Sequence, residues 1–394
     1  MSAAVLDCAH YDVGECRSCT WLRLPYDDQL AAKDRAARSA AMPATDAATA
    51  WLPPHHSAAA GFRNKAKMVV TGTVDAPVLG ILGPPAVGGV GGVDLQDCPL
   101  HTPGLQAALP ELAAFVTRAG LRPYDIVERS GELKHILVTE SPDGELMARW
   151  VLRSTEAEAR IRKHLPWLRR RLPTLRVVTL NIQPTPAALL EGEREIVLTE
   201  RATMPMRLGE HTLHLGPRSF FQTNTAVAAA LYARAAEWID DTAPASLWDL
   251  YCGVGGFALH AAAPGRVVTG IEISDAAIAS AERSRDEAVA DGRPIGEVRF
   301  LAADATSYVL GSRVAQRPEM VVVNPPRRGL GAALADWIEG SGVRHVLYSS
   351  CNPVTLGADL GRMGSYRVAR GQTFDMFPQT AHAEVLVLLT RRGG

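Results

Sequence analysis

Four short apolar runs in the second half of the chain, each followed by a glycine, acidic or amide residue, constrain the fold most. The first run, residues 246–250, leads into residues 251–257, which contain Gly253, Gly255 and Gly256 ahead of a predicted helix. A strand that ends in a glycine turn and opens a helix begins a nucleotide-binding α/β fold, because glycines let the backbone approach a ligand closely. The pattern therefore predicts a Rossmann-like parallel sheet.

The other three runs end at side chains that suit a nucleoside ligand. The second run ends at Glu272, which can accept hydrogen bonds from both ribose hydroxyls. Asp304 follows the third run and can meet an adenine amino group, and Asn324 follows the fourth. The longer glycine turn typical of phosphate-rich dinucleotides is absent. We therefore expect S-adenosylmethionine, a nucleoside without phosphates, in a crevice lined by Gly253 and these three residues.

A thiol and a carboxylate lie at strand edges near the C-terminus. Cys351 comes soon after the apolar run 346–348, and Glu384 precedes another apolar run. A lone cysteine beside a strand is usually a small buried hydrophobe, so the pair alone is weak evidence. A methyl donor bound nearby would give the pair of Cys351 and Glu384 a chemical role. The Cys351 thiolate can add to C6 of a flipped-out uracil, C5 can take the methyl group, and Glu384 can remove the C5 proton.

Composition limits the class of protein. The 394 residues are enough for two or three domains, and 47% hydrophobic with 21% charged residues is typical of a soluble globular chain. The formal net charge of −1 means that nucleic-acid contact must come from local basic patches. No apolar stretch reaches the roughly 20 residues of a membrane span, and the N-terminus does not read as a signal peptide. We expect a cytoplasmic protein with no membrane partner.

Four cysteines in the first hundred residues predict a metal centre. They comprise one C-x-x-C pair and two outlying cysteines, one of them followed by proline: Cys8, Cys16, Cys19 and Cys98. Zinc and iron–sulfur clusters both accept four thiolates, so the number of ligands does not separate them. The uneven spacing favours a [4Fe–4S] cluster over zinc, and the third alternative is four ordinary reduced cysteines.

Two basic segments are candidate RNA contacts. Arg63, Lys65 and Lys67 alternate along a predicted strand and so share one face, which suits phosphate or, equally, a solvated edge strand. A helix around residues 160–171 is rich in arginine, and it fits an RNA footprint or a solvated face paired with nearby glutamates. Residues 83–92 are rich in glycine and proline and predict a flexible loop.

The pattern of predicted helices and strands changes along the chain and indicates three consecutive stretches. Residues 1–104 form a segment organised by the cluster, residues 105–215 an α+β RNA-binding domain, and residues 216–394 the α/β catalytic domain. The metal centre belongs with the α+β part.

Nearly the whole chain resembles the class I RNA uridine C5-methyltransferases. The resemblance runs from Cys8 through Phe-Arg-Asn-Lys-Ala-Lys at 62–67 and Phe-Phe-Gln-Thr-Asn at 220–224 to Thr-Ala-His-Ala-Glu at 380–384. It implies a class I S-adenosylmethionine methyltransferase domain and a [4Fe–4S] cluster on the four N-terminal cysteines. It also implies a nucleophile at Cys351, a general base at Glu384 and a set of residues that hold the methyl donor: Gln222, Tyr251, Glu272 and Asn324.

Two features narrow the choice inside that family. The chain starts almost at its cluster cysteines, which leaves no room for the N-terminal TRAM barrel common in members that modify uridine 1939. The tRNA-directed members lack the cysteine set and usually carry Asp at the position of Asn324. The resemblance thus favours methylation of uridine 747 in 23S rRNA, with that rRNA as partner and no obligate protein partner. A second rRNA uridine, uridine 1939 or tRNA stay open as targets.

Two rival interpretations differ in class. Asn324-Pro325-Pro326 also suits a methyltransferase that acts on an exocyclic amino group, and such an enzyme needs neither Cys351 nor Glu384. The chain could instead be a non-enzymatic, cluster-bearing RNA-binding or redox-sensing protein whose α/β half is vestigial. S-adenosylmethionine binding and the effect of Cys351→Ala separate these alternatives.

Overall fold

The chain folds into two compact units. The computed structural model describes residues 5–86, 89–186 and 189–393. Each unit joins segments that are distant in sequence: Thr20–Ala58 and Arg207–Gly394 in unit 1, and Leu6–Cys19 and Ala59–Met206 in unit 2. This division differs from the three consecutive stretches expected from sequence, because the segment after Cys19 belongs to the unit that holds the C-terminal half. None of the helices in the described ranges is long and apolar enough to cross a bilayer.

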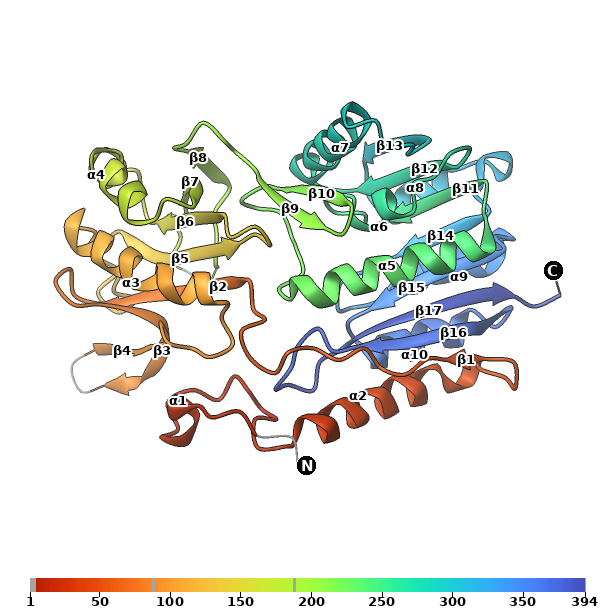
Figure 1. Cartoon of the computed structure of the whole chain (residues 1–394), viewed down its shortest axis with the longest axis horizontal. Helices are drawn as coiled ribbons and strands as arrows, with labels where there is room; N and C mark the ends of the chain where they lie inside the picture. The colour runs from red at the N-terminus through yellow and green to blue at the C-terminus, as the bar shows by residue number, and fades with distance from the viewer. Residues whose placement is uncertain (1–4, 87–88, 187–188, 394) are drawn as a thin grey trace. The chain divides into compact units, whose positions relative to one another are not determined.

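Unit 1 is built on a mostly parallel sheet of eight strands (Figure 1). In spatial order they are β1 (Ala50–Trp51), β16 (Tyr366–Phe374), β17 (Glu384–Arg391), β15 (His345–Ser350), β14 (Met320–Val323), β11 (Ser246–Leu250), β12 (Val267–Glu272) and β13 (Glu297–Ala302). Only β17 runs antiparallel to its neighbours in this sheet. Since β11 to β14 are parallel neighbours, their carboxyl ends meet at one edge. The predicted parallel sheet is present.

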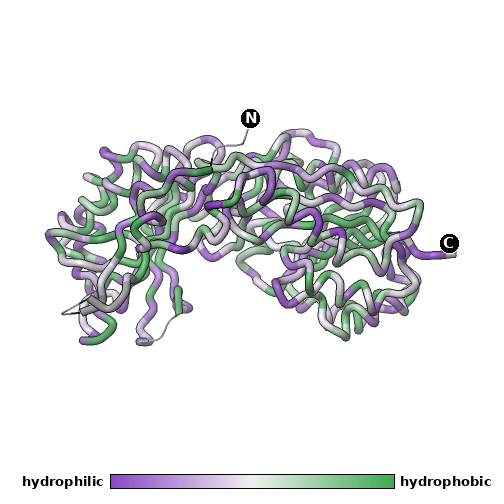
Figure 2. Tube along the Cα trace, turned by 90° about the horizontal axis from the view of Figure 1, so that it is seen from below, coloured by the Kyte–Doolittle hydropathy of each residue, from purple (hydrophilic) through white to green (hydrophobic). Residues whose placement is uncertain are grey.

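Helices cover both faces of this sheet. They are α2 (Tyr26–Ala41), α5 (Thr225–Thr242), α6 (Gly256–His260), α7 (Asp275–Ala290), α8 (Ala305–Gly311), α9 (Ala332–Ser341) and α10 (Pro353–Arg362), with short 3-10 turns at Met42–Ala44 and Val314–Gln316. One apolar core joins α2, α8, α9 and α10 to the strands, through residues such as Ala37, Val309, Leu334 and Leu356. Burial of such side chains is the main source of stability. Figure 2 shows hydrophobic strands running through the interior of this unit.

Polar side chains fix where the helices after the strands begin. Ser274 accepts a hydrogen bond from the N–H of Ala277 at the start of α7, and Asn352 accepts one from Val354 at the start of α10. Such caps satisfy N–H groups that have no partner inside the helix, and each contributes about 1 kcal/mol. The caps also fix the loops between the strand ends and the helices.

Unit 2 contains a seven-stranded, mostly antiparallel sheet. In spatial order its strands are β4 (Gly89–Asp94), β3 (Pro77–Ala86), β2 (Lys65–Gly72), β5 (Leu133–Glu140), β6 (Leu146–Leu152), β7 (Leu175–Ile182) and β8 (Arg194–Val197). Its helices are α1 (Ala9–Asp12), α3 (Pro103–Arg118) and α4 (Glu158–Arg171). A two-stranded sheet of β9 (Met204–Leu208) and β10 (His211–Leu215) lies where the chain passes from unit 2 to unit 1.

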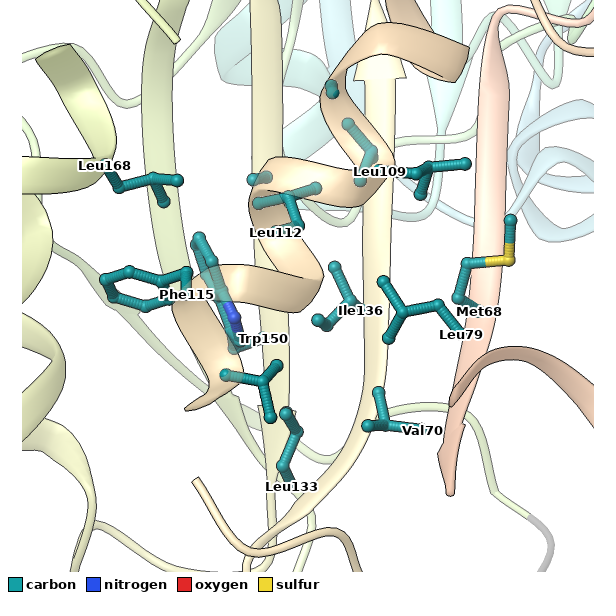
Figure 3. Close-up of a cluster of buried hydrophobic side chains, with 14 of the residues drawn as sticks. Met68, Val70, Leu79, Leu109, Leu112, Phe115, Leu133, Ile136, Trp150 and Leu168 are labelled. Atoms are coloured by element: carbon teal, nitrogen blue, oxygen red, sulfur yellow. The ribbon is translucent and has the colours of Figure 1, made fainter. Parts of the chain in front are cut away.

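The core of unit 2 lies between one face of this sheet and the helices α3 and α4. Leu109, Leu112 and Phe115 project from α3 toward the strands, where Ile136 and Trp150 meet them (Figure 3). The rings of Phe115 and Trp150 lie 5.4 Å apart at 56°. The apolar residues of α3 thus form a stripe along one side of the helix, which the sheet buries.

The prediction of a flexible loop over the glycine-rich residues 83–92 is wrong. Most of this segment belongs to the hairpin of β3 and β4, and residues 87–88 lie outside the described part of the chain. Glycine is needed here because the backbone approaches its neighbours closely. A Cβ added to Gly92 would lie 1.8 Å from the Thr71 hydroxyl, and one added to Gly80 would lie 1.8 Å from the Val93 carbonyl. Close packing rather than flexibility accounts for this composition.

Candidate active site

The glycine turn after β11 has the strained backbone that a close ligand approach requires. Gly253 and Gly255 have positive φ angles of 54° and 86°, and Tyr251 has a φ of 68°, which is rare for a residue with a side chain. A Cβ on Gly256 would come within 2.6 Å of the Tyr232 ring. Backbone strain of this kind gathers at ligand sites. The turn is therefore shaped by its glycines, as the sequence predicts.

Glu272 lies next to this turn at the end of β12. Its Oε2 accepts a hydrogen bond from the Gly253 N–H at 3.3 Å, and its Oε1 accepts one from the Ser274 N–H at 3.0 Å. The two main-chain bonds hold the carboxylate in place. Each oxygen has a further lone pair, which suits the paired hydroxyls of a ribose. The structure thus brings together Gly253 and Glu272.

Tyr251 follows β11 and Asp304 follows β13 of the same sheet, and the charge of Asp304 acts on Tyr251. The negative charge of Asp304 is among the causes that raise the pKa of Tyr251, after burial of the ring. Asp304 also caps α8, because its Oδ1 accepts from the N–H and hydroxyl of Ser307, each at 2.8 Å. Those bonds lower the pKa of Asp304 and keep it ionised. The side chain is exposed, so capping leaves its other oxygen accessible.

Asn324 and Glu384 meet where β14 ends and β17 begins. The Asn324 amide donates to Glu384 Oε1 at 3.1 Å, and the Ser349 hydroxyl donates to the same oxygen at 2.5 Å. Glu384 is only 1% exposed. Burial raises its pKa to about 7, while the two hydrogen bonds pull it down. A buried carboxyl that titrates near neutral pH is suited to accept a proton.

Cys351 lies beside this carboxyl, directly after β15. The thiol is half-buried, and burial is the largest cause that raises its pKa, followed by the negative charge of Glu384. Arg327 opposes both effects, through its charge and a hydrogen bond to the sulfur. The carbonyl of Arg327 accepts from the Asn352 amide at 3.0 Å. A cation fixed beside a thiol favours the thiolate, the reactive form.

Gln222 comes from another part of unit 1, the segment that precedes α5. It is 7% exposed. Two residues later, Asn224 caps α5 and donates through its amide to the Ser57 hydroxyl at 2.8 Å. The segment is thereby attached to the N-terminal part of unit 1.

Sequence reasoning did not assign a role to two residues of the site. Ser349 bonds Glu384, and Arg327 contacts Cys351. Ser349 lies on β15 and Cys351 follows this strand two residues later, so alternation of side chains was an available signal. Arg327 follows the Asn-Pro-Pro segment, but only the fold brings it to the thiol.

The four N-terminal cysteines lie in unit 2 as free, partly exposed thiols. Burial raises the pKa of Cys19 to about 12, and the charges of Cys98, Cys16 and Cys8 raise it further. The four thiols therefore influence one another electrostatically. In the described ranges, no group of three or more His, Cys, Asp or Glu side chains is arranged to hold a single metal ion. The predicted metal centre is thus not shown by the structure.

The two basic segments differ in their partners. On α4, Arg162 pairs with Glu158 at 2.9 Å and Arg160 pairs with Glu156, which favours the solvated helix face. On β2, Lys67 is exposed and Lys65 half-buried on one face of the strand. Arg63 instead turns back to donate to the Lys65 carbonyl at 3.0 Å. The expected common face therefore holds for the two lysines.

Known proteins match this chain closely in sequence. The family described as tRNA (uracil-5-)-methyltransferase matches residues 210–392. The 23S rRNA (uracil(747)-C(5))-methyltransferase RlmC of Yersinia pestis (strain Pestoides F) is 47% identical over 391 residues, which cover 98% of this chain and 100% of the relative. RlmC of Yersinia pseudotuberculosis serotype O:1b (strain IP 31758) is 46% identical over the same coverage.

A solved structure matches the fold. It is the Pyrococcus abyssi tRNA (uracil-54, C5)-methyltransferase in complex with S-adenosyl-L-homocysteine, with a TM-score of 0.74 and 22% identity over 95% of this chain and 85% of that one. The Rossmann-like methyltransferase fold predicted from the strand ends is confirmed. With the full-length relatives, the family inferred from the sequence motifs is also confirmed: the chain belongs to the RNA (uracil-C5) methyltransferases.

Proposed function

We propose that this protein methylates C5 of uridine 747 in 23S rRNA, in the cytoplasm, with S-adenosylmethionine as the methyl donor. The identity of 47% over nearly the full length to an enzyme of that printed name supports the target. The observation that carries the chemistry is Glu384, a buried carboxyl with a pKa of about 7 beside the Cys351 thiol. C5 methylation of uracil needs a nucleophile and, near it, a base that works at neutral pH.

The strand ends fit the methyl donor, which supplies an electrophilic methyl group when bound. Glu272 would accept hydrogen bonds from the ribose hydroxyls, above a turn that Gly253 keeps open. Asp304 would accept from the adenine amino group. Three further residues would complete the contact: Gln222, Tyr251 and Asn324. The fit rests on the exposed oxygen of Asp304 and on the glycine turn, both features of this chain.

The reaction then follows from the side chains. The Cys351 thiolate forms a bond to C6 of the uracil, and the C5–C6 electron pair moves onto C5. C5 then takes the methyl group as the S–CH3 bond of the donor breaks and S-adenosylhomocysteine is left. Glu384 accepts the C5 proton. The electron pair of the broken C5–H bond restores the double bond and expels the thiolate. Glu384 then releases its proton to solvent, which returns the enzyme to its starting state. Arg327 supports the ionised thiol throughout. The uridine must leave its stack to reach Cys351.

Asn324 distinguishes this reaction from methylation of an exocyclic amino group. In the latter, the asparagine side chain grips the target nitrogen. Here its amide already donates to Glu384 Oε1 at 3.1 Å, which ties it to the base. This contact favours the C5 reaction.

Methylation mapping of 23S rRNA tests the proposal. Cells without this protein should lose one 5-methyluridine, at position 747, and the wild-type gene should restore it. The Cys351→Ala variant should fail to restore it, while Arg38→Ala, a change at a partly exposed residue of α2 in the same unit, serves as the control. Loss at position 1939 or in tRNA instead would contradict the target. Full activity of Cys351→Ala would contradict the mechanism.

We further propose that Cys8, Cys16, Cys19 and Cys98 hold a [4Fe–4S] cluster that organises the N-terminal part of unit 2. A four-iron cluster spaces its thiolates more widely than a single ion does, and the mutual effect on the pKa of Cys19 supports a common neighbourhood. Methyl transfer needs no redox step, so the role is structural. Iron and sulfide content should fall in Cys98→Ser. Normal RNA affinity in a cluster-free variant would contradict the organising role.

A further inference from the structure

The sheet of unit 2 has two unlike faces. On β2, Met68 and Val70 point into the core beneath α3, and they are 3% and 1% exposed. The alternate residues Lys65, Lys67 and Val69 point to the other side. The strand pairing places His135 opposite Val69, so β5 contributes to this second face. We call it the open face of unit 2.

A cavity of about 300 Å³ lies at one end of the open face. Val69, His135 and Tyr124 belong to its lining, together with the apolar side chains of Leu82 and Ile126. Leu82 is 44% exposed and Ile126 is 50% exposed. Exposed apolar side chains gathered around a hollow mark a binding site rather than ordinary surface. The volume lies at the lower end of the range for small organic ligands, about 300–1,000 Å³.

A few polar groups break the apolar lining. Lys134 Nζ lies 4.6 Å from the centroid of the Tyr124 ring and donates to the Thr185 carbonyl at 2.8 Å. The ammonium group is therefore fixed at the wall of the cavity. His135 Nδ1 is buried, with no hydrogen-bond partner in the described part of the chain. A buried polar atom without a partner costs about 1–3 kcal/mol, so the cavity wall is not fully satisfied by the protein alone.

The two lysines lie on the same strand face as the cavity wall. Lys65, Lys67 and Val69 follow one another at intervals of two residues, so their side chains lie in a row on one face of β2. The pKa of Lys65 is lowered to about 8, first by burial and then by the positive charges of Lys67 and Arg149, while the charge of Glu191 partly opposes them. A phosphate near the lysines would relieve the repulsion between these positive charges. A strip of positive charge thus leads to an apolar and aromatic hollow.

We propose that the open face of unit 2 binds a single-stranded segment of the substrate RNA, with one unstacked base in the cavity and the adjoining phosphates on Lys65 and Lys67. The base in question is not the methylated uridine. This arrangement suits RNA because its loops present splayed bases that proteins bind with aromatic and polar groups. The inference rests on the proposed function for the identity of the substrate.

Two variants test the two halves of the surface. Leu82→Asp places a negative charge at the mouth of the cavity and should weaken binding of an RNA hairpin carrying uridine 747 about tenfold, within the range for loss of one base contact. Lys67→Ala should weaken binding of all RNAs alike and reduce the slope of log affinity against log salt by about 1. Lys163→Ala, an exposed lysine on α4, is the matched control and should change neither. If Lys163→Ala weakens binding and Lys67→Ala does not, the proposal fails.

A set of abasic RNAs identifies the bound base. Removing one base of the loop, other than uridine 747, should cost wild-type protein about tenfold in affinity, and Leu82→Asp should lose nothing more on that RNA. Additive losses at every position would overturn the proposal. Circular dichroism and the affinity for S-adenosylmethionine show whether the Leu82→Asp and Leu82→Asn variants are folded. Leu82→Asn adds polarity without charge, so it separates these two effects. RNA binding is measured separately from methyl transfer. A wild-type protein that binds the RNA hairpin but does not methylate it would contradict the proposed function, and the binding surface could still be tested.

Discussion

Asn324 and Glu384 come from strand ends that are 60 residues apart, yet the Asn324 amide donates to Glu384 Oε1 at 3.1 Å. This bond joins a residue of the proposed donor site to the proposed base. It favours the ionised carboxylate, against a burial that favours the neutral acid. The balance leaves Glu384 able to take and release a proton near neutral pH.

Replacing Glu384 with glutamine should trap the reaction. Without a base, the C5 proton stays and the thiolate cannot leave, so we expect methyl transfer to proceed once and turnover to fall by about 10²–10⁴-fold. A protein–RNA adduct that survives denaturing electrophoresis should accumulate. Cys351→Ala/Glu384→Gln should form none. An adduct that persists without Cys351 would place the covalent bond elsewhere.

Replacing Ser349 with alanine should move the pH dependence. The Ser349 hydroxyl lowers the pKa of Glu384 by bonding its charged form, so its loss raises that pKa above about 7 and leaves less base at neutral pH. The rising limb of kcat/KM should shift to higher pH by roughly one unit, as expected for loss of one hydrogen bond to a charge.

Ser350→Ala provides the comparison for this experiment. The neighbouring hydroxyl donates to the Asn352 carbonyl at 3.1 Å rather than to Glu384. Its removal should leave the limb in place, even if the rate falls. Equal shifts in both variants would show that Ser349 acts through general disruption.

Replacing Lys33 should destabilise unit 1. Lys33 and Asp375 form an ion pair of 2.6 Å in which both side chains are fully buried. Lys33→Ala leaves a buried carboxylate unpaired and should cost about 3–5 kcal/mol in urea unfolding. Arg38→Ala, at a partly exposed pair with Asp34, should cost at most about 1 kcal/mol. Lys33→Met/Asp375→Leu should recover most of the loss, and failure to recover would mean that packing, not charge, is responsible.

Replacing Gly256 with alanine should impair S-adenosylmethionine binding. Its new Cβ would lie 2.6 Å from the buried Tyr232 ring, so the turn or the ring must move. Isothermal titration should show weaker binding, by about tenfold or more if the turn moves. Gly311→Ala, where a Cβ meets nothing within 4 Å, should bind normally. Normal binding by Gly256→Ala would show that Tyr232 yields instead.

Local patterns were sufficient to predict the strand ends of the parallel sheet. Glu272 and Gly253 could be paired from sequence because the carboxyl ends of neighbouring parallel strands share an edge. The contact of Arg327 with Cys351 could not be predicted, because α9 and β15 separate the two residues in the chain. The hairpin of β3 and β4 was missed because close backbone packing and flexibility both select glycine.

The membership of unit 1 was also beyond local patterns. The pairing of β1 with β16 joins Ala50 to Arg370, and no short-range periodicity encodes a contact over such a separation. The roles of the site residues and of the cluster cysteines stay predictions.

Helix α2 near the N-terminus packs against α10 near the C-terminus. During synthesis, α2 emerges early but its partner Asp375 is made more than three hundred residues later, so Lys33 spends that time in water. Completion of the catalytic unit therefore waits for the end of translation. For the same reason, a fragment consisting of residues 216–394 would expose the apolar surface that α2 covers, and it should aggregate unless residues 20–58 are supplied with it.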